Sequence, residues 1–449
     1  MPRPGLSRRL ALLGGTTNWG DCQVALGYLA HPRTITRGTA ITEYERTFAR
    51  FVGVRHAHSF AAGRVGLYGL LRVLGVGPGH EVLLSAPTHI VVANAIRYTG
   101  ATPVFVDCEA DTCNIDVEQA RKRVTPSTRV LLLQHTFGIP ADIDAATRLA
   151  SDHGLDLIED CVHALGATYK GRPVGSFGRA AFFSTEETKT ISSTMGGMVV
   201  TDDDEVAAGI AAFQTACAWP DPWLVSRYLL KLVVYHLFTQ PHLHRYIRAL
   251  YDRIGRRQPL PRPTSGEELR GLRPPRYEVR LSNAQAKLAA RQLGRLGVNL
   301  AHREAIARVY ETRLRSAGAR LPMPPATAKA AYVRFPVWVE DREAAVRAAA
   351  PYAVLGTWFT SVLEESTSPA DGGYQDGSCP TAEHAAAHLV NLPTHPRVRG
   401  QDAQLIVDAV AELAMRERSV SPARWQGSGA EGGPLEGPDR SSKVSTGRP

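Results

Sequence analysis

Two segments of the sequence place reactive side chains directly after apolar runs that are typical of buried strands. "LDLIED" ends on Asp160, and "AAFFSTEETK" leads from Ser184 to Lys189. A carboxylate can keep a ring nitrogen protonated, and a lysine amine can form a Schiff base with an aldehyde. Either residue alone is weak evidence, because most aspartates after strands cap turns and most lysines are solvated. Their occurrence together at strand ends favours a cofactor site.

Two other strand ends add the remaining parts of such a site. "HSFAAGRVGLYGLL" has a turn of small residues that ends at Gly63, where a helical pattern begins. Free backbone N–H groups at a helix start bind phosphate. "SAPTHIVVANA" carries His89, whose flat ring can stack on a second ring. An amine, a carboxylate, a phosphate-binding helix start and a flat ring together fit pyridoxal phosphate.

The elements that must position these residues alternate between short β-rich runs and helical patterns, from about residue 55 to 205. The runs are continuously apolar, as in a sheet that helices cover on both faces. We therefore expect an α/β protein whose large domain has a helix-flanked, mostly parallel seven-stranded sheet. Ligands of such sheets bind beyond the carboxyl ends of the strands. The seven runs are "HAHSF", "EVLLSA", "TPVFVD", "RVLLLQHT", "LDLIED", "AAFFST" and "GMVVTD".

The alternation of strand and helix patterns ends after this region, so we expect the chain to be divided into an arm, two domains and a tail. Residues 1–40 are expected to form an N-terminal arm, and residues 41–265 a large cofactor-binding domain with an apolar helical insertion at about 219–262. Long helical patterns and the strand candidates "AAYVRFPVWVE" and "HLVNLP" predict a smaller C-terminal α+β domain over 276–418. The Gly-, Pro- and Ser-rich tail, 419–449, is expected to be disordered.

Charge and composition narrow the class of partner. The chain has 52 basic and 43 acidic residues, a net charge of +9, but no block of like charges. This distribution favours a solvated arginine-rich surface over a nucleic-acid-binding face, and it suits anionic small substrates. His384 and His388 have helical metal-ligand spacing without an evident third ligand, so we expect no metal site.

The cysteines and the apolar segments indicate the cellular compartment in which the protein is expected. Six cysteines lie far apart without a CxxC pair, as is typical of reduced thiols in a cytoplasmic protein. The first residues lack the apolar core of a signal peptide, so export is not expected. The longest apolar stretch, 223–238, is shorter than the roughly 20 residues that span a bilayer. A buried or dimer-facing helix is expected there, with a helix on a membrane surface as the less favoured alternative.

With these residues in place, the chain from about 35 to 415 resembles the DegT/DnrJ/EryC1/StrS family of pyridoxal-phosphate-dependent sugar aminotransferases, which have fold type I. The similar segments occur in the family's order: "GHEVLLSAPTHIVVANAIRYTGATPVFVDCEADTCNID", "HTFGIPADIDA", "LIEDCVHALGATYKGRPVGSFG" and "FFSTEETKTISSTMGGMVVTDD". The resemblance implies that Lys189 is the Schiff-base lysine and the proton shuttle, and that Asp160 pairs with the pyridine nitrogen. It also implies that Ser184 contacts the phosphate, that His89 stacks on the cofactor ring, and that two subunits build each site.

Three positions depart from the family's pattern. Arg64 stands where a threonine usually follows the phosphate-loop glycine, and we expect its guanidinium to bind the phosphate. "RYEVR" replaces a segment whose asparagine reaches the partner subunit's phosphate, so Glu278 is the candidate partner-subunit residue. A carboxylate there is expected to orient Arg64 across a dimer interface. His163 stands where a glutamine often bonds the cofactor's phenolic oxygen; a histidine can do the same, or tune the cofactor by its charge.

The resemblance implies an enzyme that transfers an amino group from glutamate or glutamine to a keto-sugar, expected to be a nucleotide-linked deoxysugar, in aminosugar, glycan or natural-product biosynthesis. Aminocyclitols are possible substrates, because the same chemistry acts on a ring ketone. A sugar dehydratase and a non-catalytic regulatory protein are the alternatives. Retention of Asp160, Ser184 and Lys189 argues against the regulatory alternative, and Lys189 argues against the dehydratase.

Overall fold

The seven β-rich runs form one sheet, in the order β1-β10-β9-β6-β5-β2-β4. Antiparallel pairing is confined to β10, which lies between β1 and β9, whereas the strands from β9 to β4 are parallel. The expected mostly parallel seven-stranded sheet is thereby confirmed. Its strands are β1 (His56–Phe60), β2 (Glu81–Ser85), β4 (Thr102–Val106), β5 (Thr128–Gln134), β6 (Asp156–Asp160), β9 (Ala180–Ser184) and β10 (Gly197–Thr201).

Helices cover both faces of this sheet. Successive side chains of a strand therefore point into two different apolar cores, one on each face. In β5, Leu131 and Leu133 belong to one core, while Val130 and Leu132 belong to the other. The first core is closed by α2 (Ala40–Val52), α5 (Val117–Lys122), α6 (Ile143–His153) and α10 (Asn283–Leu293). The second is closed by α3 (Gly63–Val73), α4 (Ile90–Arg97) and α7 (Asp204–Ala216).

Short polar residues and glycines set the helix ends. The side chain of Asp142 accepts from the backbone N–H of Ala145 at the start of α6, and Gly154 ends that helix with φ 64°. Gly53 ends α2 in the same left-handed conformation, with φ 82°. Only glycine adopts this conformation without steric cost, which is why the helical patterns stop at these residues.

The structure is a computed structural model that describes residues 8–12, 15–244 and 264–416. The expected tail, 419–449, lies outside the described residues, as do residues 245–262 of the expected insertion. The first half is α8 (Pro222–Phe238), which packs on α1 (Trp19–Ala30). These two helices and α10 share a small apolar core that includes Cys22, Leu229 and Leu288.

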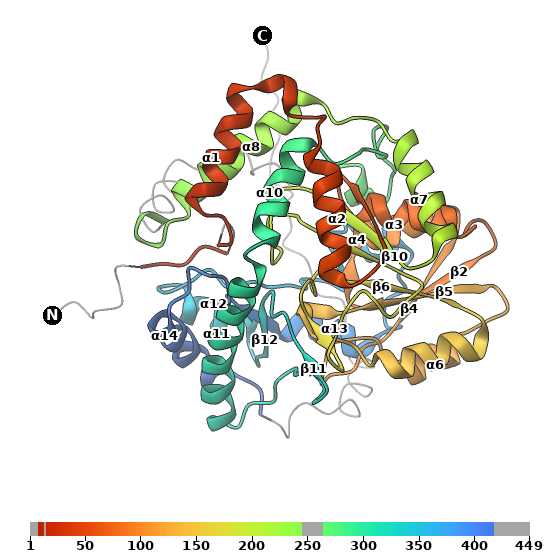
Figure 1. Cartoon of the computed structure of the whole chain (residues 1–449). Helices are drawn as coiled ribbons and strands as arrows, with labels where there is room; N and C mark the ends of the chain where they lie inside the picture. The colour runs from red at the N-terminus through yellow and green to blue at the C-terminus, as the bar shows by residue number, and fades with distance from the viewer. Residues whose placement is uncertain (1–7, 13–14, 245–263, 417–449) are drawn as a thin grey trace, which may run out of the picture.

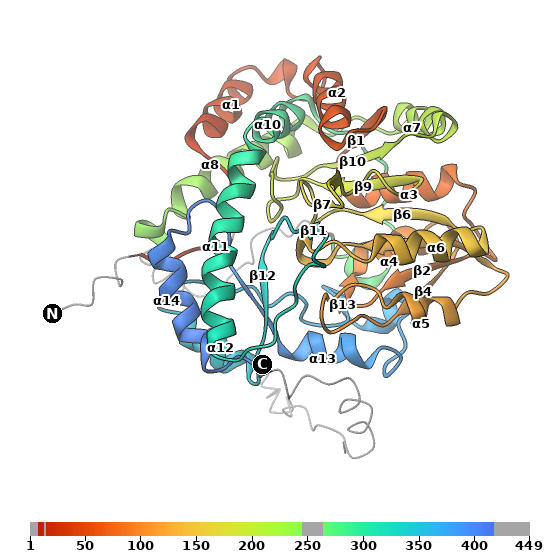
Figure 2. The same cartoon turned by 60° about the horizontal axis from the view of Figure 1, so that its bottom comes forward.

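A separate apolar core, formed by the C-terminal part of the chain, lies beside the large sheet, in the cyan and blue part of the chain (Figures 1 and 2). It is built on a two-stranded antiparallel sheet, β12 (Phe335–Trp338) with β14 (Leu389–Leu392). Around it pack α11 (Leu296–Ser316), α12 (Arg342–Ala349) and α14 (Gly400–Ala411). Because α10 packs on α2 and α11 on α14, the α10–α11 pair carries the chain from one core to the other.

Short elements complete the described chain. One pairing matters for the site, because β13 lies parallel to β3 and places Glu364 beside His89. The remaining short strands and helices are β3 (Thr88–His89), β7 (Thr168–Tyr169), β8 (Arg172–Pro173), β11 (Ala328–Lys329), β13 (Leu363–Glu364), α13 (Pro380–His388) and the 3₁₀ turns Pro32–Thr34, Thr136–Gly138, Glu268–Arg270 and Pro369–Gly372.

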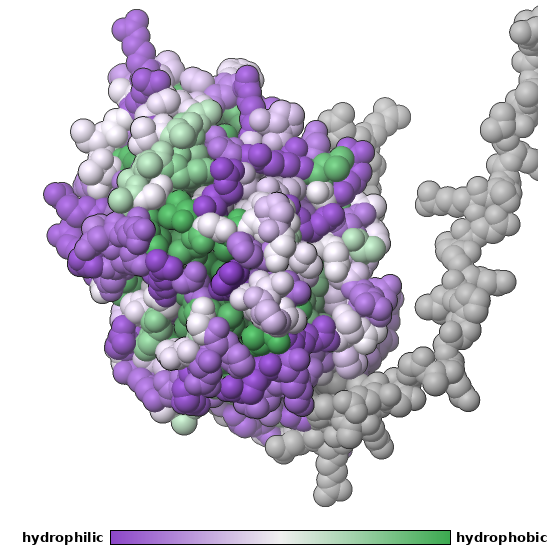
Figure 3. Space-filling model, turned by 90° about the vertical axis from the view of Figure 1, so that its right-hand side faces the viewer, coloured by the Kyte–Doolittle hydropathy of each residue, from purple (hydrophilic) through white to green (hydrophobic). Residues whose placement is uncertain are grey.

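The surface is mixed in polarity. Figure 3 shows hydrophilic residues around one face and separate apolar areas near its centre. Among the helices described, none has the length and apolar content needed to cross a membrane.

Candidate active site

A cavity of about 450 Å³ opens beyond the carboxyl ends of β6 and β9. Segments far apart in the sequence meet around it, including the start of α3, the end of α8 and the 355–365 segment. Glu278 is not among its lining residues, whereas all seven cofactor-site residues predicted from the sequence are. Those seven are Gly63, Arg64, His89, Asp160, His163, Ser184 and Lys189.

The Asp160 carboxylate has one oxygen available for a ligand. Oδ1 accepts a hydrogen bond from the backbone N–H of Val162 at 3.1 Å. Oδ2 is buried and has no hydrogen-bond partner among the described residues. Burial raises the pKa of Asp160 to about 6, although the Lys189 cation opposes this shift. A protonated ring nitrogen would supply the missing donor, so this carboxylate fits the pyridine end of pyridoxal phosphate.

The Lys189 amine is buried in the same cavity. The residue is 7% exposed, and Nζ lies 4.7 Å from the centre of the Trp358 ring. Burial lowers the pKa of Lys189 to about 8, because the cation loses its water. Arg334 lowers this pKa further, and Glu186 opposes the shift. A neutral amine is a nucleophile and a base, so the cavity prepares Lys189 for both roles.

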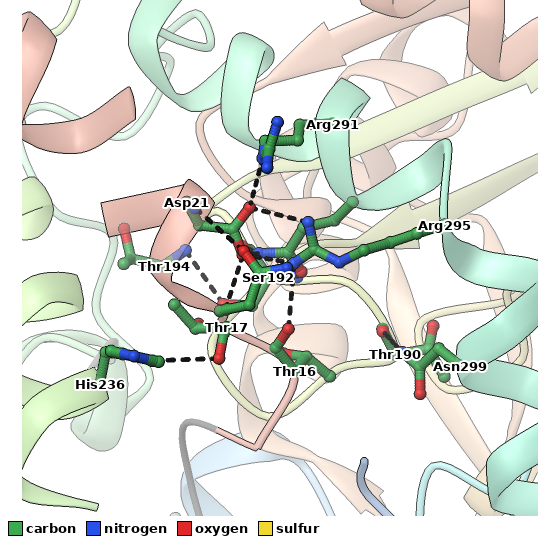
Figure 4. Close-up of polar contacts among 12 residues, drawn as sticks. Thr16, Thr17, Asp21, Thr190, Ser192, Thr194, His236, Arg291, Arg295 and Asn299 are labelled. Atoms are coloured by element: carbon green, nitrogen blue, oxygen red, sulfur yellow. Dashed lines mark hydrogen bonds and ion pairs between the residues drawn. The ribbon is translucent and has the colours of Figure 1, made fainter. Parts of the chain in front are cut away.

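Hydrogen bonds from α10 and α11 hold the segment that follows Lys189. Gln292 accepts from the Ser192 backbone N–H and donates to the Ser192 carbonyl. Asn299 donates to the Thr190 carbonyl at 2.6 Å, and the two residues lie side by side in Figure 4. Buried Asp21 of α1 accepts from Gln292 and pairs with Arg291 of α10 and with Arg295, which directly precedes α11. The lysine therefore sits on a loop fixed at several backbone atoms.

The start of α3 approaches the ends of β9 and β10 closely. A Cβ on Gly63 would lie 3.0 Å from the Phe183 carbonyl oxygen, and a Cβ on Gly197 would lie 2.4 Å from the Gly63 nitrogen. Glycine at both positions lets the helix start reach the strand ends. Ser184 Oγ lies at this junction, where it accepts from the Glu186 backbone N–H at 3.3 Å. The first-turn N–H groups and the hydroxyl form a cradle that fits a phosphate.

Within one chain, Arg64 and Glu278 each form an ion pair with a residue that the sequence analysis did not name. The Arg64 guanidinium forms an ion pair with Glu268 of its own chain, with Nε 2.5 Å from Oε1. Glu278 pairs instead with Arg273. Sequence reasoning missed Glu268, which is 2% exposed, because it follows a proline-rich connector without a recognisable motif. Glu268 is thus the acid beside the start of α3. Arg64 lines the cavity and remains paired with Glu268.

Two histidines frame the cavity around Trp358. His89 Nδ1 accepts from the Val91 N–H and caps α4, and its ring meets the Trp358 ring at 6.3 Å and 69°. The His163 ring lies 4.8 Å from Trp358, and both its nitrogens are buried without partners among the described residues. Burial holds the pKa of His163 well below 6.5, so the ring is neutral. A neutral histidine can bond a phenolic oxygen, but it cannot tune the site by its charge.

Further lining residues were not foreseen. Trp358 and Arg334 come from the smaller C-terminal part, where no motif marks them. Glu187 pairs with Lys231 of α8 at 2.9 Å, and both side chains are largely buried. The adjacent acids just before Lys189 were the available signal for this pair, but the partner helix could not be inferred from it.

One buried cluster outside the cavity has metal-ligand chemistry. His135, Glu159 and Cys161 lie together, but the Glu159 carboxylate already accepts from three backbone N–H groups and contacts His135 at 3.2 Å. These bonds stabilise the charged form and hold the pKa of Glu159 below its ordinary value despite burial. The cluster is therefore a structural network.

Comparison with known proteins identifies the family that the sequence motifs resemble, and the match extends over most of the chain. The family model of the DegT/DnrJ/EryC1/StrS aminotransferase family matches residues 23–222 and 237–411. The spore coat polysaccharide biosynthesis protein SpsC of Bacillus subtilis is 29% identical over 388 residues, which are 84% of this chain and 90% of SpsC. The GDP-perosamine synthase of Caulobacter vibrioides is 31% identical over 287 residues, which are 64% of this chain and 65% of the synthase.

Solved structures share the fold. S. venezuelae DesV in complex with a ketimine intermediate is 28% identical, with a TM-score of 0.67 over 88% of this chain and 94% of DesV. The PLP form of the putative sugar aminotransferase Spr1654 from Streptococcus pneumoniae is 20% identical, with a TM-score of 0.67 over 88% of this chain and 95% of that chain. At that identity, the second likeness supports the fold alone.

Proposed function

Because the chain belongs to the DegT/DnrJ/EryC1/StrS aminotransferase family, whose members are pyridoxal-phosphate-dependent sugar aminotransferases, we propose that it aminates a nucleotide-linked keto-sugar with glutamate or glutamine as donor. The observation that carries the proposal is one cavity that holds the Lys189 amine, the free Asp160 oxygen and the glycine-lined helix start. A nucleotide-linked substrate is supported by the name of the relative GDP-perosamine synthase. The basic chain, net +9, suits a diphosphate.

When bound, pyridoxal phosphate supplies an electron sink next to the carbon that loses a proton. Asp160 Oδ2 would accept a hydrogen bond from the ring nitrogen and keep it protonated. The start of α3 and Ser184 would hold the phosphate, with Arg64 at their side. Lys189 Nζ takes the proton from the donor's α-carbon, and its pKa of about 8 leaves part of it as free base near neutral pH. The same amine returns a proton when the sugar is aminated.

We further propose that the enzyme acts as a homodimer in the cytoplasm. The outer faces of α1 and α8 carry exposed apolar side chains, among them Trp19, Trp223 and Leu230, and their burial would favour association. All six cysteines are free and buried, which suits a reducing compartment. Sedimentation equilibrium of the purified chain should give twice the mass of 48.7 kDa, and a monomer at micromolar concentration would contradict the dimer.

A single-turnover assay tests the proposed reaction. The protein loaded with pyridoxal phosphate should convert to the pyridoxamine phosphate form with L-glutamate or L-glutamine, and a nucleotide-linked keto-sugar should restore the original form. Mass spectrometry should then detect an aminosugar nucleotide. Loss of the sugar's hydroxyl group without gain of nitrogen would indicate a dehydratase instead.

A further inference from the structure

The Arg334 guanidinium is a buried cation on the cavity wall. The residue is 6% exposed, and no described residue forms a hydrogen bond or ion pair with its side chain. Its contact is the Trp358 ring, whose centre lies 4.5 Å from Cζ. Burial lowers the pKa of Arg334 to about 10, which still leaves it charged at neutral pH. An unpaired buried charge is costly, so its retention in a cavity indicates an anionic ligand.

The nearby carboxylates do not serve as partners of Arg334. Glu186 and Glu364 attract it at longer range. Glu186 instead accepts from the backbone N–H and the hydroxyl of Thr188, and Glu364 accepts from the same two groups of Thr360. These bonds hold both acids on their own loops.

The arginine is fixed relative to Lys189. Both cations lie over the Trp358 ring. A chain of hydrogen bonds along α11 also joins their backbones. Asn299 donates to the Thr190 carbonyl and accepts from Arg303 Nε, and Arg303 donates to the Val333 carbonyl at 3.0 Å. The loop after Lys189 and the segment just before β12 that carries Arg334 therefore share one support, part of which Figure 4 shows.

A glycine leaves room for the guanidinium. A Cβ on Gly356 would lie 3.0 Å from Arg334 Nη1, which is tighter than an ordinary contact. With glycine there, the planar group can stay between this backbone and the cavity. A guanidinium in this position can bind a carboxylate through two parallel hydrogen bonds.

We propose that Arg334 binds the α-carboxylate of the amino-acid donor. This inference rests on the proposed function. In an α-amino acid the amine and the carboxylate share one carbon, so an amine that reaches Lys189 brings its carboxylate close by. A nucleotide-linked sugar carries its diphosphate on the anomeric carbon, away from a ketone across the ring. The cation beside Lys189 therefore suits the donor rather than the sugar nucleotide.

The test compares L-glutamate with L-isoglutamine, which replaces the α-carboxylate with a neutral amide. Half-reaction rates are measured on wild-type holoenzyme, Arg334→Gln, Arg334→Lys and the exposed control Arg347→Gln. Arg334→Gln should raise the half-saturating glutamate concentration on the order of 30- to 1,000-fold, the range for loss of one partner of a buried charge pair. It should also abolish the preference for glutamate over isoglutamine, and Arg334→Lys should recover part of it.

The outcomes separate this inference from the proposed function. Wild-type enzyme that does not discriminate between the two donors, or an Arg334→Gln variant that still does, would overturn the role of Arg334. An unchanged glutamate reaction with a weakened keto-sugar reaction would assign Arg334 to the diphosphate and overturn it as well. Failure of wild-type holoenzyme to react with any amino acid would contradict the proposed function itself. Unchanged visible absorbance and melting temperature in Arg334→Gln show that the variant is folded and loaded.

Discussion

At the scale of single residues, the site is built from ionisable groups whose charged forms are disfavoured. Burial raises the pKa of Asp160 to about 6 and lowers that of Lys189 to about 8. The protein without cofactor therefore holds a carboxylate, and beside it a cation, without the hydration that each would have in water. The proposed chemistry requires this arrangement, although it opposes folding.

The variant Asp160→Asn tests how much the buried Asp160 carboxylate lowers the free energy of unfolding. Between the ordinary aspartate pKa of 3.8 and about 6, the native state holds a proton that the unfolded state has released. The free energy of unfolding contributed by this group therefore falls as the pH rises through that window. Asparagine has no charge to desolvate, so cofactor-free Asp160→Asn should be more stable than wild type at pH 7.5 by roughly 1–3 kcal/mol, and by about a third of that difference at pH 4.5.

Urea unfolding at the two pH values measures this difference, with the exposed Asp376→Asn as control. The same variant should lose transamination, because an amide cannot keep the ring nitrogen protonated. A variant less stable than wild type at pH 7.5 would show that Asp160 has a stabilising partner in the native state.

At the scale of elements, α8 carries apolar side chains on both of its sides. Val225, Leu229 and Leu232 pack on α1 and α10, while Trp223 and Leu230 are exposed on the opposite side. Lys231 and Tyr235 project from α8 towards the Lys189 loop and the cavity. The Lys231–Glu187 ion pair thus joins the helix to the loop that carries Lys189.

Lys231→Met should loosen this connection. Burial and Glu186 already raise the pKa of Glu187 to about 7, and loss of Lys231 removes the group that opposes the shift. We expect a loss of roughly 1–3 kcal/mol, because an uncompensated carboxylate is left in a largely buried place. Hydrogen exchange should become faster in α8 and in the loop before Lys189.

Two controls make this test specific. Lys287→Met breaks the exposed pair with Glu43, so stability should change little. The double variant Lys231→Met with Glu187→Gln should recover part of the loss, since the unpaired charge is gone. Equal losses in the single and double variants would contradict a role for the ion pair.

At the scale of the whole molecule, the sheet and most of the cofactor cavity were predictable, because they depend on local patterns. Continuous apolar runs, glycines after helices and polar residues at strand ends mark the elements and their functional edge. The parts contributed by the C-terminal region were not predictable. Arg334 and Trp358 lie near Lys189 because segments far apart in the sequence pack together, and no local pattern encodes that approach. Arg64 shows the same limit, since no motif marks Glu268, its acidic partner within the chain.

The central claim is that Lys189 is the amine that both holds the cofactor and moves the proton. The most direct measurement is the absorbance spectrum of purified protein with pyridoxal phosphate, for wild type and Lys189→Ala, before and after addition of L-glutamate. Wild type should show a visible band that survives gel filtration and disappears with glutamate. Lys189→Ala should show no such band, although Asp160 and Ser184 remain. A variant that keeps the band after gel filtration and loses it with glutamate at the wild-type rate would contradict the account.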